Sequence, residues 1–174
     1  MLPAPALDIR QQYDQLTRGL SGQIERLAER LEQIGWCLHC RPGCADCCVA
    51  FSVFPLEAAI IAARAADLVA GLTAAQPAPA PDVCVLLENG RCRIYPFRPI
   101  ICRSQGLPLA YVDEERQSVE VSACLINFPE GTEFTMEELL FLDEINRRLA
   151  ALNIAYCRDH RLDAGRRLPL AEIF

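Results

Sequence analysis

The stretch that decides the fold is CRPGCADCC at residues 40–48, which places four thiols within nine residues. Its Pro-Gly pair suits the central positions of a type II turn, which would bring Cys40 back toward Cys44. The two residues between Cys44 and Cys47 allow one metal ion to bind both sulfurs. Because adjacent side chains project differently from the backbone, we expect Cys47 and Cys48 to serve two metal ions, or two irons of one cluster.

A second set of cysteines follows after a gap of 35 residues, at Cys84, Cys92 and Cys102. Asn89-Gly90 lies between two apolar runs and predicts a β-hairpin, which would place Cys84 and Cys92 at neighbouring positions on paired strands. Closing the gap costs about 3 kcal/mol of chain entropy, whereas a structural zinc site returns about 10 to 16 kcal/mol. One metal ion could therefore hold the two sets together and make folding depend on it.

Ten cysteines are unusual in a chain of 174 residues, which is long enough to bury one hydrophobic core. Disulfide scaffolds are typical of secreted chains shorter than about 80 residues. The N-terminal residues contain no basic run followed by an apolar stretch, so we expect no signal peptide and a cytoplasmic location. In that reducing compartment, thiols stay free or bind metal.

Charge and composition remove several function classes. All 17 basic residues are arginine, so a phosphate-loop lysine and a Schiff-base lysine are excluded. The formal charge of −6 argues against nucleic acid as a partner, and no apolar run reaches the roughly 18 residues of a membrane span. With two histidines and no evident catalytic triad, whether the chain is an enzyme stays open, and its redox or protein partner is unknown.

An amphipathic helix is expected at the N-terminus, within residues 1–35. Between Asp8 and Ile34 the apolar residues recur at steps of three and four, which is the helical period. Gly19 and Gly22 offer a point at which the helix could divide into two. We expect its apolar stripe to pack within the chain, and a homodimer through this helix is the alternative.

Further elements follow the first cysteine run. Pro55 is well placed to begin a second helix that runs to about Val69. A proline-rich linker is expected at residues 72–82. The runs LPLAYV and VEVSA predict a second, weaker hairpin across residues 113–118.

The last expected element is a helix with a short tail, in residues 132–174. Thr135 and Glu138 form a capping-box pattern that predicts its start. The whole chain is expected to form one domain of the α+β class, mostly α-helical. Three main helices would surround an irregular cysteine-rich metal-binding centre at residues 40–125, with one or two short β-hairpins.

Arginines surround the second cysteine set. The stretch from Arg91 to Arg103 carries four arginines and no acid. Arg91 and Arg93 are expected to make surface ion pairs. Arg98 and Arg103 lie in an apolar stretch close to prolines and Cys102, so we expect them to stabilise an anionic metal-thiolate centre.

The cysteine run ending in Cys47-Cys48, followed by C-x7-C-x2-YPxRPxxCR over residues 84–103, resembles the bacterial cysteine-cluster family (CxxCxxCC, YkgJ-like). Members of this family are described as zinc- or iron-chelating and are often labelled iron–sulfur proteins. The resemblance implies metal binding by Cys40, Cys44, Cys47, Cys48, Cys84, Cys92, Cys102 and Cys124, with Tyr95, Arg98 and Arg103 as supporting residues. The first gap here is three residues rather than two, so Cys37 is an alternative to Cys40.

Two functions follow from an all-thiolate ligand set, which suits a zinc site or an iron–sulfur cluster. The adjacent cysteine pair, the arginines and the lack of histidine ligands favour an iron–sulfur or iron protein with an electron-transfer or oxidoreductase-supporting role. The alternative is a zinc-binding structural, interaction or metal-handling protein without catalytic activity. Cys157 and His160 are expected to be an exposed pair rather than ligands.

Overall fold

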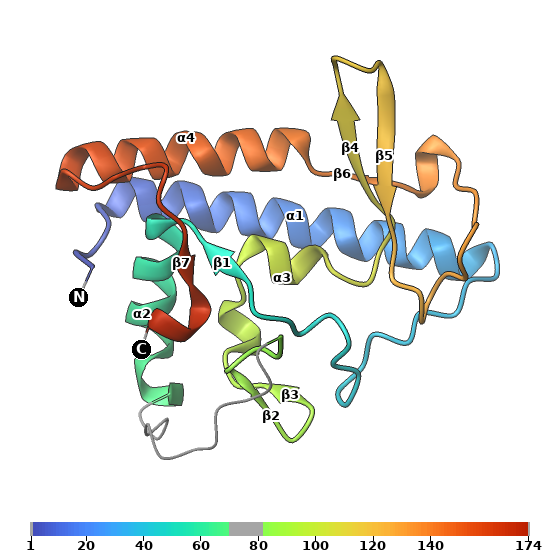
Figure 1. Cartoon of the computed structure of the whole chain (residues 1–174), viewed down its shortest axis with the longest axis horizontal. Helices are drawn as coiled ribbons and strands as arrows, with labels where there is room; N and C mark the ends of the chain where they lie inside the picture. The colour runs from blue at the N-terminus through green and yellow to red at the C-terminus, as the bar shows by residue number, and fades with distance from the viewer. Residues whose placement is uncertain (1, 70–81, 174) are drawn as a thin grey trace.

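The computed structural model describes residues 2–69 and 82–173, so the expected linker lies outside the described residues except for its last position. The α-helices in this part are α1 (Leu7–Gln33), α2 (Pro55–Val69), α3 (Ile100–Ser104) and α4 (Asp143–His160). α1 and α4 lie side by side and antiparallel, and α2 lies across one end of the pair (Figure 1). None of the helices described is both long enough and apolar enough to cross a membrane.

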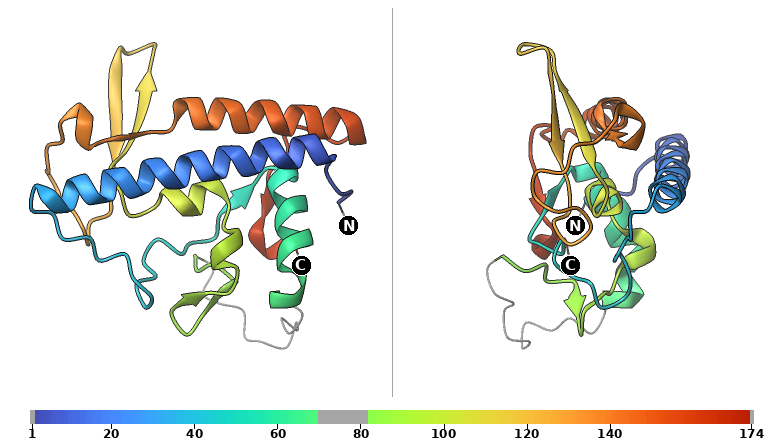
Figure 2. Two further views of the ribbon diagram at one scale, coloured as in Figure 1. Left: turned by 180° about the vertical axis from the view of Figure 1, so that it is seen from behind. Right: turned by 90° about the vertical axis from the view of Figure 1, so that its right-hand side faces the viewer.

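The strands are short and form small sheets. They are β1 (Ser52–Val53), β2 (Leu87–Glu88), β3 (Arg91–Cys92), β4 (Leu109–Asp113), β5 (Ser118–Ser122), β6 (Leu140–Phe141) and β7 (Leu168–Pro169). β1 pairs with β7, β2 with β3, and β4 lies between antiparallel β5 and parallel β6. Both expected hairpins are present, and the β4–β5 hairpin projects from the helical body (Figure 2). The mostly helical α+β class is confirmed.

α1 is one continuous helix that does not divide at Gly19 and Gly22. Burial of its apolar stripe stabilises the helix by more than the cost of about 1 kcal/mol for each glycine in a helix. The buried apolar side chains are Ile9, Tyr13, Leu16, Leu20, Leu27 and Leu31, and they belong to the core of this chain. The stripe therefore packs within the chain. A homodimer through α1 stays a prediction, and it would have to use the exposed face of the helix.

The C-terminal helix begins later than the sequence predicts. The capping box of Thr135 and Glu138 does form, but it opens only a short 3-10 turn, η2 (Met136–Glu138). The chain then extends as β6, because the Leu140 N–H donates to the Pro108 carbonyl beside β4. α4 starts only at Asp143.

Two clusters of buried side chains divide the interior, and α2 contributes to both. Leu56 and Ile60 face the first core, which also takes in the apolar faces of α1 and α4. Ala58, Ile61 and Ala65 face the second core, which lies between α2, the β1–β7 pair and the segment around β2 and β3. The second core is the support on which part of the cysteine set rests.

Candidate metal centre

The cysteine loop folds as two consecutive turns. The Cys44 N–H donates to the Arg41 carbonyl (3.0 Å), and Gly43 between them has φ +101°, as the third residue of a type II turn requires. The Cys48 N–H then donates to the Ala45 carbonyl (2.8 Å). The expected Pro-Gly turn is therefore present, and the two turns gather the thiols of this loop.

The β2–β3 hairpin places the second cysteine set beside this loop. Asn89 and Gly90 have φ values of +51° and +72°, which type I′ hairpin turns need and glycine adopts without strain. The Gly43 N–H donates to the Gly90 carbonyl (3.2 Å), and a Cβ at Gly90 would come within 3.4 Å of the Gly43 Cα. The turn of one cysteine segment thus contacts the turn of the other.

Cys48 and Cys84 are also joined through the backbone. Val49 and Val83 form an antiparallel bridge, and next to it the Cys84 N–H donates to the Cys48 carbonyl (3.0 Å). Residues opposite each other in an antiparallel pair carry their side chains on the same face. Cys48 and Cys84, 36 positions apart in the chain, therefore lie opposite each other with their side chains on the same face.

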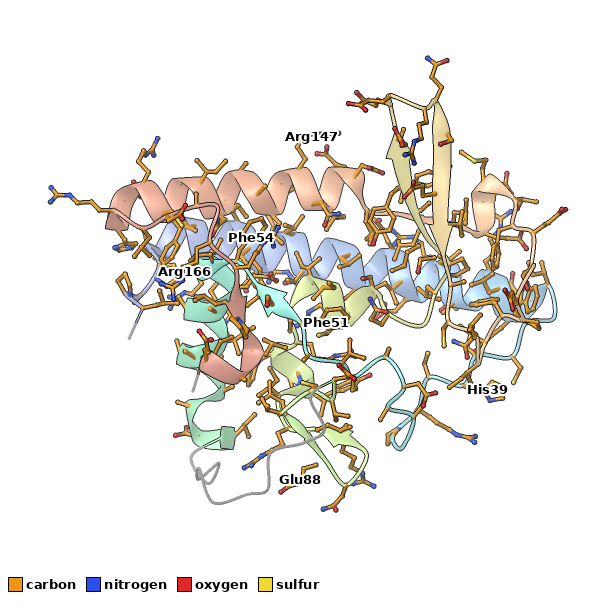
Figure 3. The ribbon with its side chains drawn as sticks, in the orientation of Figure 1. His39, Phe51, Phe54, Glu88, Arg147 and Arg166 are labelled. Carbon is orange, nitrogen blue, oxygen red and sulfur yellow. The ribbon has the colours of Figure 1, made fainter. Side chains whose placement is uncertain are left out.

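The hairpin is shorter than the sequence predicts, and Cys84 lies outside its paired strands. Cys92 pairs with Leu87, not with Cys84, because the Leu87 N–H turns back to the Cys84 carbonyl (3.0 Å) and shortens the first strand. Cys84 and Cys92 both still contact the second core. Arg93, next to β3, forms an ion pair with Glu88, with 3.9 Å between the Arg93 Nε and the Glu88 Oε2. Figure 3 shows Glu88 at the outer edge of the hairpin.

Cys102 lies in α3, which follows a 3-10 turn, η1 (Tyr95–Phe97). Arg103 holds this turn by donating to the carbonyls of Arg98 (2.7 Å) and Pro96 (2.8 Å). Arg98 stacks over the Tyr95 ring, with its guanidinium carbon 3.6 Å from the ring centroid. The two arginines thus differ in position: Arg103 binds backbone carbonyls, while the Arg98 side chain lies at the cysteines.

A cavity of about 450 Å³ lies between the cysteine loop and the hairpin. The cysteines lining it are Cys40, Cys44, Cys47, Cys48, Cys92 and Cys102. Arg91, Tyr95, Arg98 and Gln105 complete much of the wall, and none of its lining residues is His, Asp or Glu. Six of the eight cysteines predicted to bind metal therefore surround one space.

A second cavity of about 270 Å³ adjoins the first and brings in Cys124. Cys47 and Gln105 line both cavities, and Cys124 and Gly106 line the second. A Cβ at Gly106 would lie 2.3 Å from the Cys40 Sγ, so a side chain here would push this thiol out of its position. Glycine at this position lets Cys40 lie at the boundary between the two cavities.

Asn127 ties Cys40 to the turn that carries Cys124. Its buried side chain donates from Nδ2 to the Cys40 Sγ (3.3 Å) and to the Gly106 carbonyl (2.7 Å), and its Oδ1 accepts from the His39 N–H (2.8 Å). The Asn127 N–H donates to the Cys124 carbonyl (3.0 Å). Sequence reasoning missed both Asn127 and Gly106, because these contacts join distant segments and leave no local pattern.

The eight cysteines fall into two groups by what they lie against. Four lie within or against the second core, and we call them the inner cysteines: Cys48, Cys84, Cys92 and Cys102. The others lie along the cysteine loop and the Asn127 turn, and we call them the outer cysteines: Cys40, Cys44, Cys47 and Cys124.

The remaining two cysteines lie elsewhere. Cys37 is exposed and lines neither of these two cavities, so the structure places Cys40 rather than Cys37 at the centre. His39 beside it is also exposed, at the outer side of the loop (Figure 3). Cys157 is buried in the first core, where its Sγ contacts the Asn153 Oδ1 (3.5 Å), so the expectation of an exposed Cys157 is wrong.

Burial and mutual proximity favour the neutral thiols. Burial raises the pKa of Cys47 to about 11, with further contributions from Cys48, Cys40 and Cys44. Burial, then Cys84 and Cys92, raise the pKa of Cys102 well above its usual range, and the charge of Arg98 opposes this. A thiophilic cation that binds here therefore displaces protons, which makes its affinity rise with pH.

The donor chemistry of the centre fits zinc or iron, which thiolates bind readily. Within residues 2–69 and 82–173, no three Cys, His, Asp or Glu side chains converge closely enough to hold an ion as they stand. The gathered thiols, the cavity and the Gly106 backbone against Cys40 are the features that suit a metal group.

Comparison with known protein families places this centre in context. A family model, CxxCxxCC, described as "Putative zinc- or iron-chelating domain", matches residues 39–125, which is half of the chain. The chain belongs to the CxxCxxCC family. The CxxCxxCC match begins just before the cysteine loop and ends after Cys124, so it spans all eight inner and outer cysteines, and it supports metal binding. No curated protein and no solved structure matches the chain.

Proposed function

We propose that this CxxCxxCC protein is an iron–sulfur or iron protein with an electron-transfer or oxidoreductase-supporting role. The observation that carries the proposal is the 450 Å³ cavity, whose thiols come from the cysteine loop, β3 and α3. The inner and outer cysteines would hold the metal group. When bound, an iron–sulfur cluster supplies one-electron transfer at a potential set by its surroundings.

The surroundings of the cavity support electron transfer over acid–base chemistry. No imidazole or carboxylate is among its lining residues, so the groups in its wall that could transfer a proton are Tyr95 and the thiols that would bind the metal. Arg98 supplies a positive charge that stabilises an anionic metal-thiolate centre. Tyr95 in the wall is 59% exposed, so a redox group held here would lie close to the surface and within reach of a partner.

Zinc is the second candidate, as a structural or metal-handling ion without catalysis. The inner cysteines favour it, because they lie within or against the second core and a metal there would join α3, the hairpin and the cysteine loop. Structural zinc contributes directly to folding free energy.

Metal and sulfide analysis of anaerobically purified protein, with visible and EPR spectra, tests the proposal. We expect a coloured protein with sulfur-to-iron charge-transfer absorption and an EPR signal in one oxidation state. A colourless protein with stoichiometric zinc would contradict the iron–sulfur proposal and support the second candidate.

Two serine variants make this test specific to the centre. Cys92→Ser removes a thiol from the cavity wall and is expected to lower the iron content severalfold. Cys37→Ser is the matched control, because this exposed thiol lines neither cavity and its loss should leave the metal content unchanged.

A further inference from the structure

The Cys47–Cys48 peptide bond marks the boundary between two different surroundings. Cys48 contacts the second core, and its carbonyl accepts the Cys84 N–H. Cys47 lines both the main cavity and the smaller one that contains Cys124, whereas Cys48 lines only the main one of these two. The neighbouring thiols therefore share the main cavity, and each has a further contact that the other lacks.

The inner cysteines form one set around Cys48. Cys84 faces it across the antiparallel bridge, and Cys92 follows on the hairpin whose turn contacts the cysteine loop. Cys102 enters from α3, and all four thiols contact the same hydrophobic core. Four thiols from four short segments on one core are the number and type of donors that a four-thiolate zinc or iron site would use.

The outer cysteines form the other set around Cys47. The turn at Gly43 holds Cys44 within the same loop, with Cys40 just before it. Asn127 donates hydrogen bonds both to the Cys40 Sγ and to the Cys124 carbonyl, and thereby places Cys124 on the same side as Cys40. None of these four belongs to the second core, nor is any among the apolar residues packed against it.

We propose that the eight cysteines form two four-thiol metal sites that meet at the Cys47–Cys48 bond. The inner cysteines hold one thiophilic ion or cluster, and the outer cysteines hold a second. Each thiol gives its proton to solvent when it binds. This inference rests on the proposed function only in requiring that the centre binds metal.

Zinc is the probe for the test, whichever metal the protein holds in the cell. Reduced, metal-free, full-length protein is titrated with Zn²⁺ against a competing chelator and followed by native mass spectrometry. We expect two zinc ions per chain. In chains that carry one zinc, N-ethylmaleimide should leave four additional thiols unmodified relative to metal-free protein, and all four should belong to one group.

Adjacent serine variants provide matched tests of the boundary. Cys47→Ser should keep one zinc ion, bound by the inner cysteines, and Cys48→Ser should keep one, bound by the outer cysteines. Cys37→Ser should keep two. If either variant fails to fold, the alkylation pattern of the unmodified sequence still decides the grouping.

The outcomes separate this inference from the proposed function. One zinc ion per chain, or one ion that protects thiols from both groups together, would overturn the two-site inference and leave a metal-binding protein. A chain that binds neither zinc nor iron at the centre would overturn the proposed function itself. Two ions with the inner and outer groups protected separately would support the division.

Discussion

At the scale of single residues, two uncharged residues hold the thiol of the outer cysteine Cys40 in place. Gly106 brings its backbone against the Cys40 Sγ, and the Asn127 amide donates to the same sulfur. Hydrogen bonds from amides orient a thiolate ligand and stabilise its charge. Metal affinity here thus depends on a glycine and an asparagine as well as on cysteines.

Replacing Gly106 by alanine should destabilise the protein and displace Cys40. Its φ is +97°, and the new Cβ would lie 2.3 Å from the Cys40 Sγ. Gly131→Ala is the control, because Gly131 has φ +80° but nothing within 4 Å of an added methyl group. Backbone strain of about 1 to 2 kcal/mol is common to both, and moving the Cys40 Sγ away from the Asn127 amide should add about 0.5 to 1.5 kcal/mol to Gly106→Ala alone. Urea unfolding of the metal-free proteins measures the difference, and equal losses would contradict the contact.

Glu57 is a buried carboxyl between α1 and α3 that sequence reasoning did not single out. It accepts hydrogen bonds from the Tyr13 hydroxyl (3.1 Å) and the Ile100 N–H (2.9 Å). Burial raises the pKa of Glu57 above its usual value, and these hydrogen bonds oppose the shift only in part. Ionisation therefore costs more in the folded protein than in the unfolded chain.

Glu57→Gln should gain stability relative to the native protein as the pH rises. A raised folded-state pKa contributes stability that is present below the unfolded pKa and is lost as the pH climbs through the folded value. Glutamine keeps the acceptor oxygen for both hydrogen bonds and does not ionise. The difference in unfolding free energy between the two proteins, measured without metal at pH 4 and pH 7, should move in favour of Gln at pH 7. A difference that is independent of pH would contradict the role given to burial.

At the scale of the elements, α1 is held by a stripe that the rest of the chain covers. Leu20 is fully buried in the first core, whereas Leu7 at the start of the helix is 59% exposed. Leu20→Ala should lower the unfolding free energy by about 2 to 5 kcal/mol, and Leu7→Ala by less than about 0.5 kcal/mol. Thermal unfolding at several protein concentrations measures both. A midpoint that rises with concentration and a large loss for Leu7→Ala would instead support a homodimer through α1.

Elements set by local chemistry could be predicted from the sequence. Pro55 begins α2 and Asn89-Gly90 makes the hairpin turn, because each residue restricts its own backbone. Elements set by distant partners could not. The Thr135 capping box forms but does not open α4, since the strand at Leu140 pairs with β4 instead.

The same distinction applies to the candidate site. The Pro42-Gly43 pair predicted the turn that ends at Cys44, and this turn is present, whereas the next turn, from Ala45 to Cys48, was not predicted. The prediction that Cys84 lies on a strand paired with that of Cys92 was wrong, because the turn from Cys84 to Leu87 leaves Cys84 outside β2. Register depends on such backbone bonds, and a single sequence does not reveal them.

At the scale of the whole molecule, the two cores predict how far folding depends on metal. The sequence suggested that one metal ion joins both cysteine sets and thereby controls the entire fold. In the structure, the first core joins α1, α2 and α4, and none of the eight inner and outer cysteines belongs to it. The second core, in contrast, includes Cys84 and is contacted by the other inner thiols.

Metal removal should therefore loosen one part of the molecule and leave the other folded. After chelation under reducing conditions, amide exchange should quicken at the Cys84 and Arg93 N–H groups, whose partners are the carbonyls of Cys48 and Leu86. Amides in the middle of α1 and α4 should keep most of their protection, because their apolar faces pack on each other without a thiol from the metal centre. Hydrogen-exchange mass spectrometry compares the two regions in one sample, before and after chelation. Equal loss of protection in α1 and at the hairpin would mean that the first core does not stay folded without the metal. Packing of the long helices would then itself be a consequence of metal binding.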